Sequence, residues 1–152
     1  YSIGENQAEK MVDIINKQNP DIVCIAGDIF DNDYRAVRNP DKIAEILKGI
    51  KAKYGVYGCW GNHDVTETLL GGFSVHSAEN NERDTRFEEL MKKANVKMLE
   101  DEAVLVDNKF YIVGRLDYEK TGEIGLERKT VHDLTENLDK TKPIIRNRPR
   151  TK

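Results

Sequence analysis

The sequence lacks most of the features that are typical of membrane, disulfide-rich or nucleic-acid-binding proteins. Its 152 residues include only two cysteines, four prolines and 7% aromatic residues. No apolar run reaches the roughly 20 residues of a transmembrane helix, and no segment has the layout of a signal peptide. The 24 Lys and Arg and 27 Asp and Glu residues give a net charge of −3. Such a chain has no general attraction for nucleic acid or anionic lipid, so we expect no nucleic-acid partner. Because no apolar run is long enough, we also expect no membrane segment in this chain.

The two cysteines, Cys24 and Cys59, both lie within short apolar segments. Isolated thiols in such segments are typical of reduced core residues in an intracellular protein, because disulfides persist mainly in oxidising compartments. We therefore predict two buried, reduced thiols and a cytoplasmic protein.

The composition, 38% hydrophobic and 34% charged residues, is that of a globular domain. Apolar residues recur at helical spacing in residues 8–17, 40–50 and 87–94. Short apolar runs predict strands at residues 21–26, 56–60, 96–99, 103–106 and 109–115. The order strand–helix–strand over residues 20–62 is typical of a parallel sheet, in which we expect the strand at 21–26 to be buried on both faces. The sequence thus predicts an α/β fold.

The remaining pattern is weaker. Asp107-Asn108, between two predicted strands, predicts a tight hairpin. Residues 66–84 predict a long excursion, residues 134–138 a short helix, and residues 143–145 the opening of another strand. We therefore expect parallel strand–helix–strand units followed by a β-hairpin.

Polar residues follow two of the predicted strands at the point where each strand ends. Residues 27–31 read Gly-Asp-Ile-Phe-Asp, and residues 61–64 read Gly-Asn-His-Asp. In open α/β sheets, ligands bind beyond the carboxyl ends of the strands. If the two strands are neighbours, their tips lie about 5 Å apart. Since two catalytic metals lie about 3.5–4 Å apart, groups on both tips could reach one dinuclear centre.

The residue types suit such a centre. The carboxylate of Asp28 can bridge two cations, and the amide oxygen of Asn62 is a hard, neutral ligand. His63 is a candidate to donate a proton to a leaving oxygen, and Asp31 to orient that imidazole. Gly-Asp and Gly-Asn are also common turn signals, so each cluster alone has a purely structural reading.

In their order and spacing, GDIFD and GNHD resemble the second and third signature blocks of the calcineurin-like metallophosphoesterases, and the resemblance extends over residues 5–115. It implies a β-sandwich flanked by helices, two divalent metal ions (Mn, Fe, Zn or Mg), and hydrolysis of a phosphate mono- or diester. It also implies that Asp28 bridges the metals and that Asn62 binds one metal and the phosphate. His63 would be the general acid and Asp31 its partner.

The chain departs from the family pattern in two places. The family's first block, Asp-x-His, and its later histidine blocks are not found, and neither His76 nor His132 is assigned as a ligand. We therefore expect a partial metallophosphoesterase domain at residues 1–145 and a basic, disordered, non-family tail at residues 146–152. The parent protein is expected to be a hydrolase, and a membrane anchor upstream of this chain, as in some bacterial relatives, stays open. This chain alone is expected to bind metal weakly, with little or no turnover.

Two alternatives stay open. A non-catalytic scaffold on the same fold would also lack ligand blocks. An unrelated nucleotide-binding α/β domain is disfavoured, because no Gly-x-Gly-x-x-Gly or Gly-x-x-x-x-Gly-Lys-Ser/Thr motif follows either strand. The substrate, the metal and the oligomeric state are not determined by these patterns.

Overall fold

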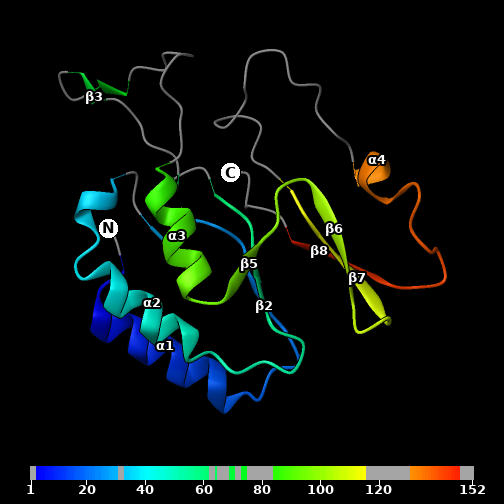
Figure 1. Ribbon diagram of the computed structural model, residues 1–152, viewed down its shortest axis with the longest axis horizontal. Helices are drawn as coiled ribbons and strands as arrows, with labels where there is room; N and C mark the ends of the chain where they lie inside the picture. The colour runs from blue at the N-terminus through cyan, green and yellow to red at the C-terminus, as the bar shows by residue number, and fades with distance from the viewer. Residues whose placement is uncertain are drawn as a thin grey trace.

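Three short parallel strands form the central sheet (Figure 1). The computed structural model describes residues 3–30, 33–61, 64, 69–70, 73–74, 84–115 and 131–147. The central sheet has the order β1-β2-β5, with β1 at Val23–Ile25, β2 at Val56–Gly58 and β5 at Val96–Met98. Because β1 and β5 both pair with β2 in parallel, the three carboxyl ends point to the same edge. This confirms the predicted parallel strand–helix–strand unit.

Three helices cover one face of this sheet (Figure 1): α1 (Glu5–Lys17), α2 (Pro40–Lys48) and α3 (Thr85–Lys93). Each buries the apolar stripe that its sequence predicts. The buried residues on these helices are Ala8, Val12, Ile43, Ala44, Leu47, Phe87, Leu90 and Met91. They form one apolar core with Val56 and Val96 of the central sheet. The helical layer therefore holds the sheet from one side.

A second sheet covers the other face of the central sheet. Its strands are β6 (Glu102–Val106), β7 (Phe110–Gly114) and β8 (Ile144–Asn147). β7 pairs with β6 in antiparallel and with β8 in parallel orientation. Alternate residues on β6 and β7, such as Val106 and Ile112, pack with Leu99 and Tyr57 into a second core between the sheets. The layers are thus helices, parallel sheet and mixed sheet, consistent with the predicted sandwich flanked by helices.

The hairpin between β6 and β7 turns on Asp107 and Asn108, as the sequence predicts. These residues have φ values of 48° and 53°, and the Lys109 N–H donates to the carbonyl oxygen of Val106 at 2.9 Å. Two successive left-handed residues closed by this bond form a type I′ turn, whose twist matches that of the paired strands.

The remaining described elements are small. They are the 3₁₀ helix η1 (Tyr34–Ala36), the antiparallel pair β3 (Leu69–Leu70) and β4 (Phe73–Ser74), and α4 (Val131–Thr135). Most of the predicted excursion at residues 66–84 lies outside the described residues. Over the ranges that the structure describes, every helix is too short or too polar to cross a bilayer.

The prediction that β1 is buried on both faces is wrong. Val23 and Ile25 contact the helical core, but Cys24 on the opposite face is exposed. Among the described strands, β1 pairs with β2 alone, so it is an outer strand of its sheet. The prediction of two buried thiols therefore fails for Cys24 and is confirmed for Cys59, which is 1% exposed.

The predicted boundary between the domain and a basic tail also needs correction. Arg146 and Asn147 are the last two residues of β8, so the boundary at residue 145 falls inside a strand. Their pairing with β7 extends the sheet beyond the apolar pair Ile144 and Ile145. Residues 148–152 lie outside the described residues.

Candidate metal centre at the strand ends

β1 and β2 end side by side, and the two polar motifs begin at these ends. Ile25 pairs with Gly58. The pairing continues one step further, because the Cys59 N–H donates to the carbonyl oxygen of Ile25 at 3.0 Å. The expectation that the two strands are neighbours is therefore confirmed, and both following segments leave the sheet at its carboxyl edge.

Gly27 and Gly61 allow these two segments to touch. Gly27 has a φ of +82°, and a Cβ atom added to it would lie 2.3 Å from the backbone nitrogen of Gly61. A Cβ atom on Gly61 would lie 2.2 Å from Oδ1 of Asp28. Neither position can carry a side chain unless the other segment moves, since both distances are far inside van der Waals contact. The carboxylate of the exposed Asp28 thus lies directly against the backbone of Gly61, the residue before Asn62.

Asp64 joins the two segments through a buried carboxylate that is 1% exposed. Its Oδ2 accepts the backbone N–H of Asp28 at 2.9 Å and that of Gly61 at 2.8 Å. Its Oδ1 accepts the backbone N–H of Phe30 at 3.3 Å. One side chain therefore connects the backbone after β1 to the backbone after β2.

The carboxylates of Asp28 and Asp64 lie near each other at this edge. Burial raises the pKa of Asp64, the three backbone N–H donors oppose that rise, and the negative charge of Asp28 adds to it. The two carboxylates are therefore close enough to repel each other. A cation bound by Asp28 would relieve this repulsion.

Both segments are anchored by buried aromatic residues. Phe30 is 2% exposed and stacks on Phe87 of α3 with a centroid separation of 5.1 Å. Trp60 is also 2% exposed, and its Nε1 donates to Glu100 at 2.7 Å. Because Asp28 lies two residues from one anchor, it cannot shift far without disturbing the core.

The end of β8 reaches the same edge. Asn147 is 4% exposed, and its Nδ2 donates to the carbonyl oxygen of Ile25 at 3.1 Å. This oxygen also accepts the N–H of Cys59, so three strand ends meet at Ile25. Sequence reasoning missed Asn147 because the basic residues around it indicated a tail.

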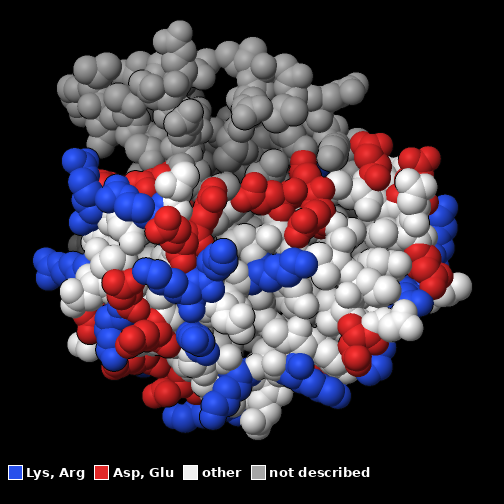
Figure 2. Space-filling view, viewed as in Figure 1, with Lys and Arg blue, Asp and Glu red and all other residues white. Residues whose placement is uncertain are grey.

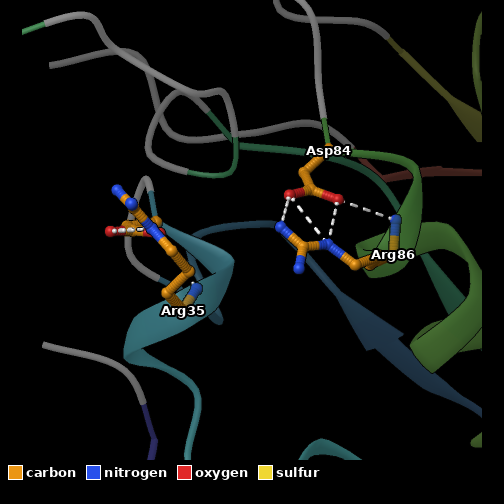
Figure 3. Close-up of polar contacts among 4 residues, drawn as sticks. Arg35, Asp84 and Arg86 are labelled. Carbon is orange, nitrogen blue, oxygen red and sulfur yellow. Dashed lines mark hydrogen bonds and ion pairs between the residues drawn. The ribbon is translucent and has the colours of Figure 1, made fainter.

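Two arginines are each held by the aspartate two residues before them (Figure 3). Nε of Arg35 donates to Asp33 at 2.9 and 3.1 Å, and Nε of Arg86 donates to Asp84 at the same distances. These bonds lower the pKa of each aspartate and raise that of each arginine. The guanidinium of Arg86 also lies over the ring of Tyr34, 4.5 Å from its centroid. More widely, basic and acidic side chains are interspersed on the face in Figure 2, which agrees with the small net charge.

Of the predicted site residues, Asp28 is described, and it lies at the expected edge. Asp31, Asn62 and His63 lie outside the described residues, so their roles stay predictions. Within the described ranges, no three His, Cys, Asp or Glu side chains are grouped closely enough to hold a metal ion.

A comparison with protein families agrees with this geometry. The family model for calcineurin-like phosphoesterases matches residues 4–151. The chain belongs to this family. The family resemblance and the α/β fold predicted from the sequence are thereby confirmed. Metal-dependent hydrolysis of phosphate esters is the general activity of calcineurin-like phosphoesterases.

Two curated relatives match parts of the chain. A Danio rerio protein named "Transmembrane protein with metallophosphoesterase domain" is 35% identical over 75 residues, which is 49% of this chain and 16% of the relative. A Caenorhabditis elegans protein named as a metallophosphoesterase is 41% identical over 63 residues, which is 41% of this chain and 12% of the relative. This calcineurin-like phosphoesterase chain therefore matches only a small part of either relative. No solved structure matches it significantly.

Of the described residues at this edge, Asp28 suits a ligand of the divalent metal that calcineurin-like phosphoesterases use, although the described residues do not complete a metal site. Asp28 offers exposed, hard carboxylate oxygens at the sheet edge, beside a glycine that leaves room around them. Asp64 does not fit as a ligand, because it is buried and both its oxygens accept backbone N–H groups. In the sequence, Asp64 is only the last residue of the Gly-Asn-His-Asp motif. Its burial could not be predicted, because burial depends on the tertiary fold.

Proposed function

We propose that this protein hydrolyses phosphate esters with two divalent metal ions held where the ends of β1 and β2 meet. The observation that carries the proposal is the contact between the Asp28 carboxylate and the backbone of Gly61. Asn62 directly follows Gly61 in the chain. The Asp64 N–H also donates to the carbonyl oxygen of Gly61 at 3.3 Å, so the residues on either side of Asn62-His63 are bonded to each other. These contacts support a cation site shared by Asp28 and Asn62.

Each site residue has one role in the proposal. Asp28 and Asn62 hold the metals, His63 donates a proton to the leaving oxygen, and Asp31 orients the imidazole of His63. Bound cations would neutralise the charge that develops on the phosphoryl oxygens. Oxygen and nitrogen ligands of this kind suit Mn, Fe, Zn or Mg. Arg35, the side chain of which is 82% exposed, is a further candidate to contact the phosphate.

Turnover by this chain alone is expected to be slow. Two divalent cations need several ligands each, and the sequence motifs provide only Asp28 and Asn62. The matched segments make up only 16% and 12% of the lengths of the two relatives. The activity of a whole relative therefore does not predict the activity of this chain. The cytoplasmic location also stays a prediction, and the name of the Danio rerio relative is compatible with a membrane anchor in a longer protein.

The test is hydrolysis of an aryl phosphodiester and an aryl phosphomonoester with added manganese. We expect slow hydrolysis that stops when the metal is chelated and is abolished in Asp28→Ala. His63→Ala should reduce the rate by about 10²–10⁴-fold, the usual contribution of a general acid. Asp107→Ala, which changes an exposed aspartate in the hairpin, should leave the rate unchanged. Manganese binding without any hydrolysis would instead favour a non-catalytic scaffold, and hydrolysis unaffected by Asp28→Ala would contradict the proposed site.

A further inference from the structure

We propose that Asp64 is a positioning residue, the carboxylate of which fixes Asp28 against Gly61 before any ligand arrives. The inference deepens the proposed function, since it explains how one metal ligand is held. It rests on four contacts among the described residues and not on the titration of any group.

Asp28 has a backbone conformation that needs support. Its φ is +56°, in the left-handed region that residues with a side chain adopt uncommonly. Gly27 before it is also left-handed. Two successive residues in this region direct the Asp28 N–H toward Asp64, which accepts it at 2.9 Å. The support therefore comes from a side chain 36 residues away in the sequence.

The bonds to Asp64 determine where Asp28 lies relative to the second segment. Oδ2 accepts the N–H groups of both Asp28 and Gly61, so these two backbone nitrogens are held by a single oxygen atom. The carboxylate of Asp28 is thereby placed beside Gly61, where a Cβ atom would collide with it. Phe30, bound by the other oxygen, anchors the same segment in the core.

A catalytic role for Asp64 does not fit these contacts. A side chain that is 1% exposed and accepts three backbone N–H groups is buried away from substrate, and its contacts are those of a residue that holds the backbone in place. Groups that orient metal ligands in this way typically change metal affinity by about 10–100-fold when they are removed.

The test compares Asp64→Asn and Asp64→Ala with the unchanged chain by two measurements. The first is the hydrogen-exchange rate of the Asp28, Phe30 and Gly61 amides, which needs no metal. Asp64→Ala removes both acceptor oxygens, and with them all three hydrogen bonds, so it should speed exchange at all three amides by about tenfold or more, the effect of losing a buried hydrogen bond. Asp64→Asn keeps the volume of the side chain but presents one acceptor oxygen instead of two. If the amide nitrogen replaces Oδ1, exchange should be faster at Phe30, and if it replaces Oδ2, exchange should be faster at both Asp28 and Gly61.

The second measurement is manganese affinity, from the broadening of amide signals near Asp28. Both variants should bind manganese about 10–100-fold more weakly. The control is Leu47→Ala, which opens a cavity among the helices but removes none of the hydrogen bonds that Asp28, Phe30 and Gly61 donate to Asp64. It should lower stability without changing manganese affinity.

The outcomes separate this inference from the proposed function. If the unchanged chain binds no manganese, the proposed function fails, while the exchange rates still test Asp64. If the three amides exchange as in the unchanged chain, or if manganese affinity falls no more than in Leu47→Ala, the positioning role is overturned. It is also overturned if neither Asp64 variant folds while Leu47→Ala does, because Asp64 would then be a requirement for folding.

Discussion

Asp28 and Asp107 have nearly the same backbone conformation but are held in it by different means. Their φ values are +56° and +48°. Asp107 lies in a hairpin closed by a bond between Val106 and Lys109, three residues apart. Asp28 is held by Asp64, which lies 36 residues away. The hairpin can therefore form from local sequence alone, whereas the strand-end site forms only when the sheet has brought both segments together.

The two ways of holding a left-handed aspartate indicate different roles for the hairpin and for the strand-end segment. A type I′ turn at residues 107–108 matches the twist of β6 and β7, so its left-handed residues serve the fold. The left-handed Asp28 belongs to no hairpin among the described residues, and it is an exposed residue beside Gly61. Strain held by distant contacts around an exposed carboxylate is typical of a functional site.

The largest effect is expected from Phe30→Ala. Removing this buried ring from its stack on Phe87 should lower the free energy of unfolding by about 3–5 kcal/mol and also weaken manganese binding, because Asp28 loses its anchor. Phe110→Ala, beside the hairpin, is the matched variant, and its half-buried ring contacts Tyr54. It should cost less stability and leave manganese binding unchanged. Denaturant unfolding and a manganese titration of both variants check this, and equal losses of metal binding would remove the distinction between the two regions.

Gly27→Ala should have the next largest effect, and Gly55→Ala is its control. Both glycines have positive φ values, +82° and +95°. A Cβ atom on Gly55 would meet only the side chain of Tyr57 at 3.7 Å, whereas one on Gly27 would lie 2.3 Å from the backbone of Gly61. Both variants should lose about 1–2 kcal/mol from the left-handed conformation, and Gly27→Ala about 1–3 kcal/mol more from the collision. Equal stability of the two variants in denaturant unfolding would show that the segments do not touch.

The thiols provide a smaller test of the strand ends. Burial raises the pKa of Cys59 to about 12, with smaller contributions from Asp64, Cys24 and Asp28. At pH 8 both thiols are mostly protonated, and the raised pKa leaves far less reactive thiolate at Cys59 than at the exposed Cys24. Alkylation followed by mass spectrometry should modify Cys24 at least about a hundredfold faster than Cys59. Comparable rates would mean that the end of β2 is open to solvent.

The smallest effect is expected from Asn108→Gly in the hairpin. Glycine adopts the left-handed conformation of this position without steric cost, so the variant should be more stable by up to about 1 kcal/mol. Its manganese binding should equal that of the unchanged chain. Denaturant unfolding measures the gain, and a loss of stability would contradict the assignment of a type I′ turn.

Local features of the fold could be predicted from the sequence. The apolar stripes of α1, α2 and α3 and the hairpin at Asp107-Asn108 depend on neighbours a few residues apart. The parallel pairing of β1 and β2 also followed from the order of elements. The exposure of Cys24 could not be predicted, because an apolar run does not show whether its strand is inner or outer in the sheet.

The contacts that build the candidate site span long stretches of chain. Asp64 bonds to Asp28 across 36 residues, and Asn147 bonds to Ile25 across 122 residues. Residue types and motif spacing identified Asp28, but they could not show that Asp64 is buried or that β8 ends at the same edge. Burial and long-range pairing arise from the packed layers, not from a local pattern.

The most direct test of the account is a manganese titration of the isotopically labelled chain followed by amide signal broadening. We predict that broadening is centred on Asp28 and Gly61, is lost in Asp28→Ala and in Asn62→Ala, and is unchanged in Asp107→Ala. Equal broadening in Asp28→Ala, or broadening centred on the hairpin, would contradict a metal site at the ends of β1 and β2.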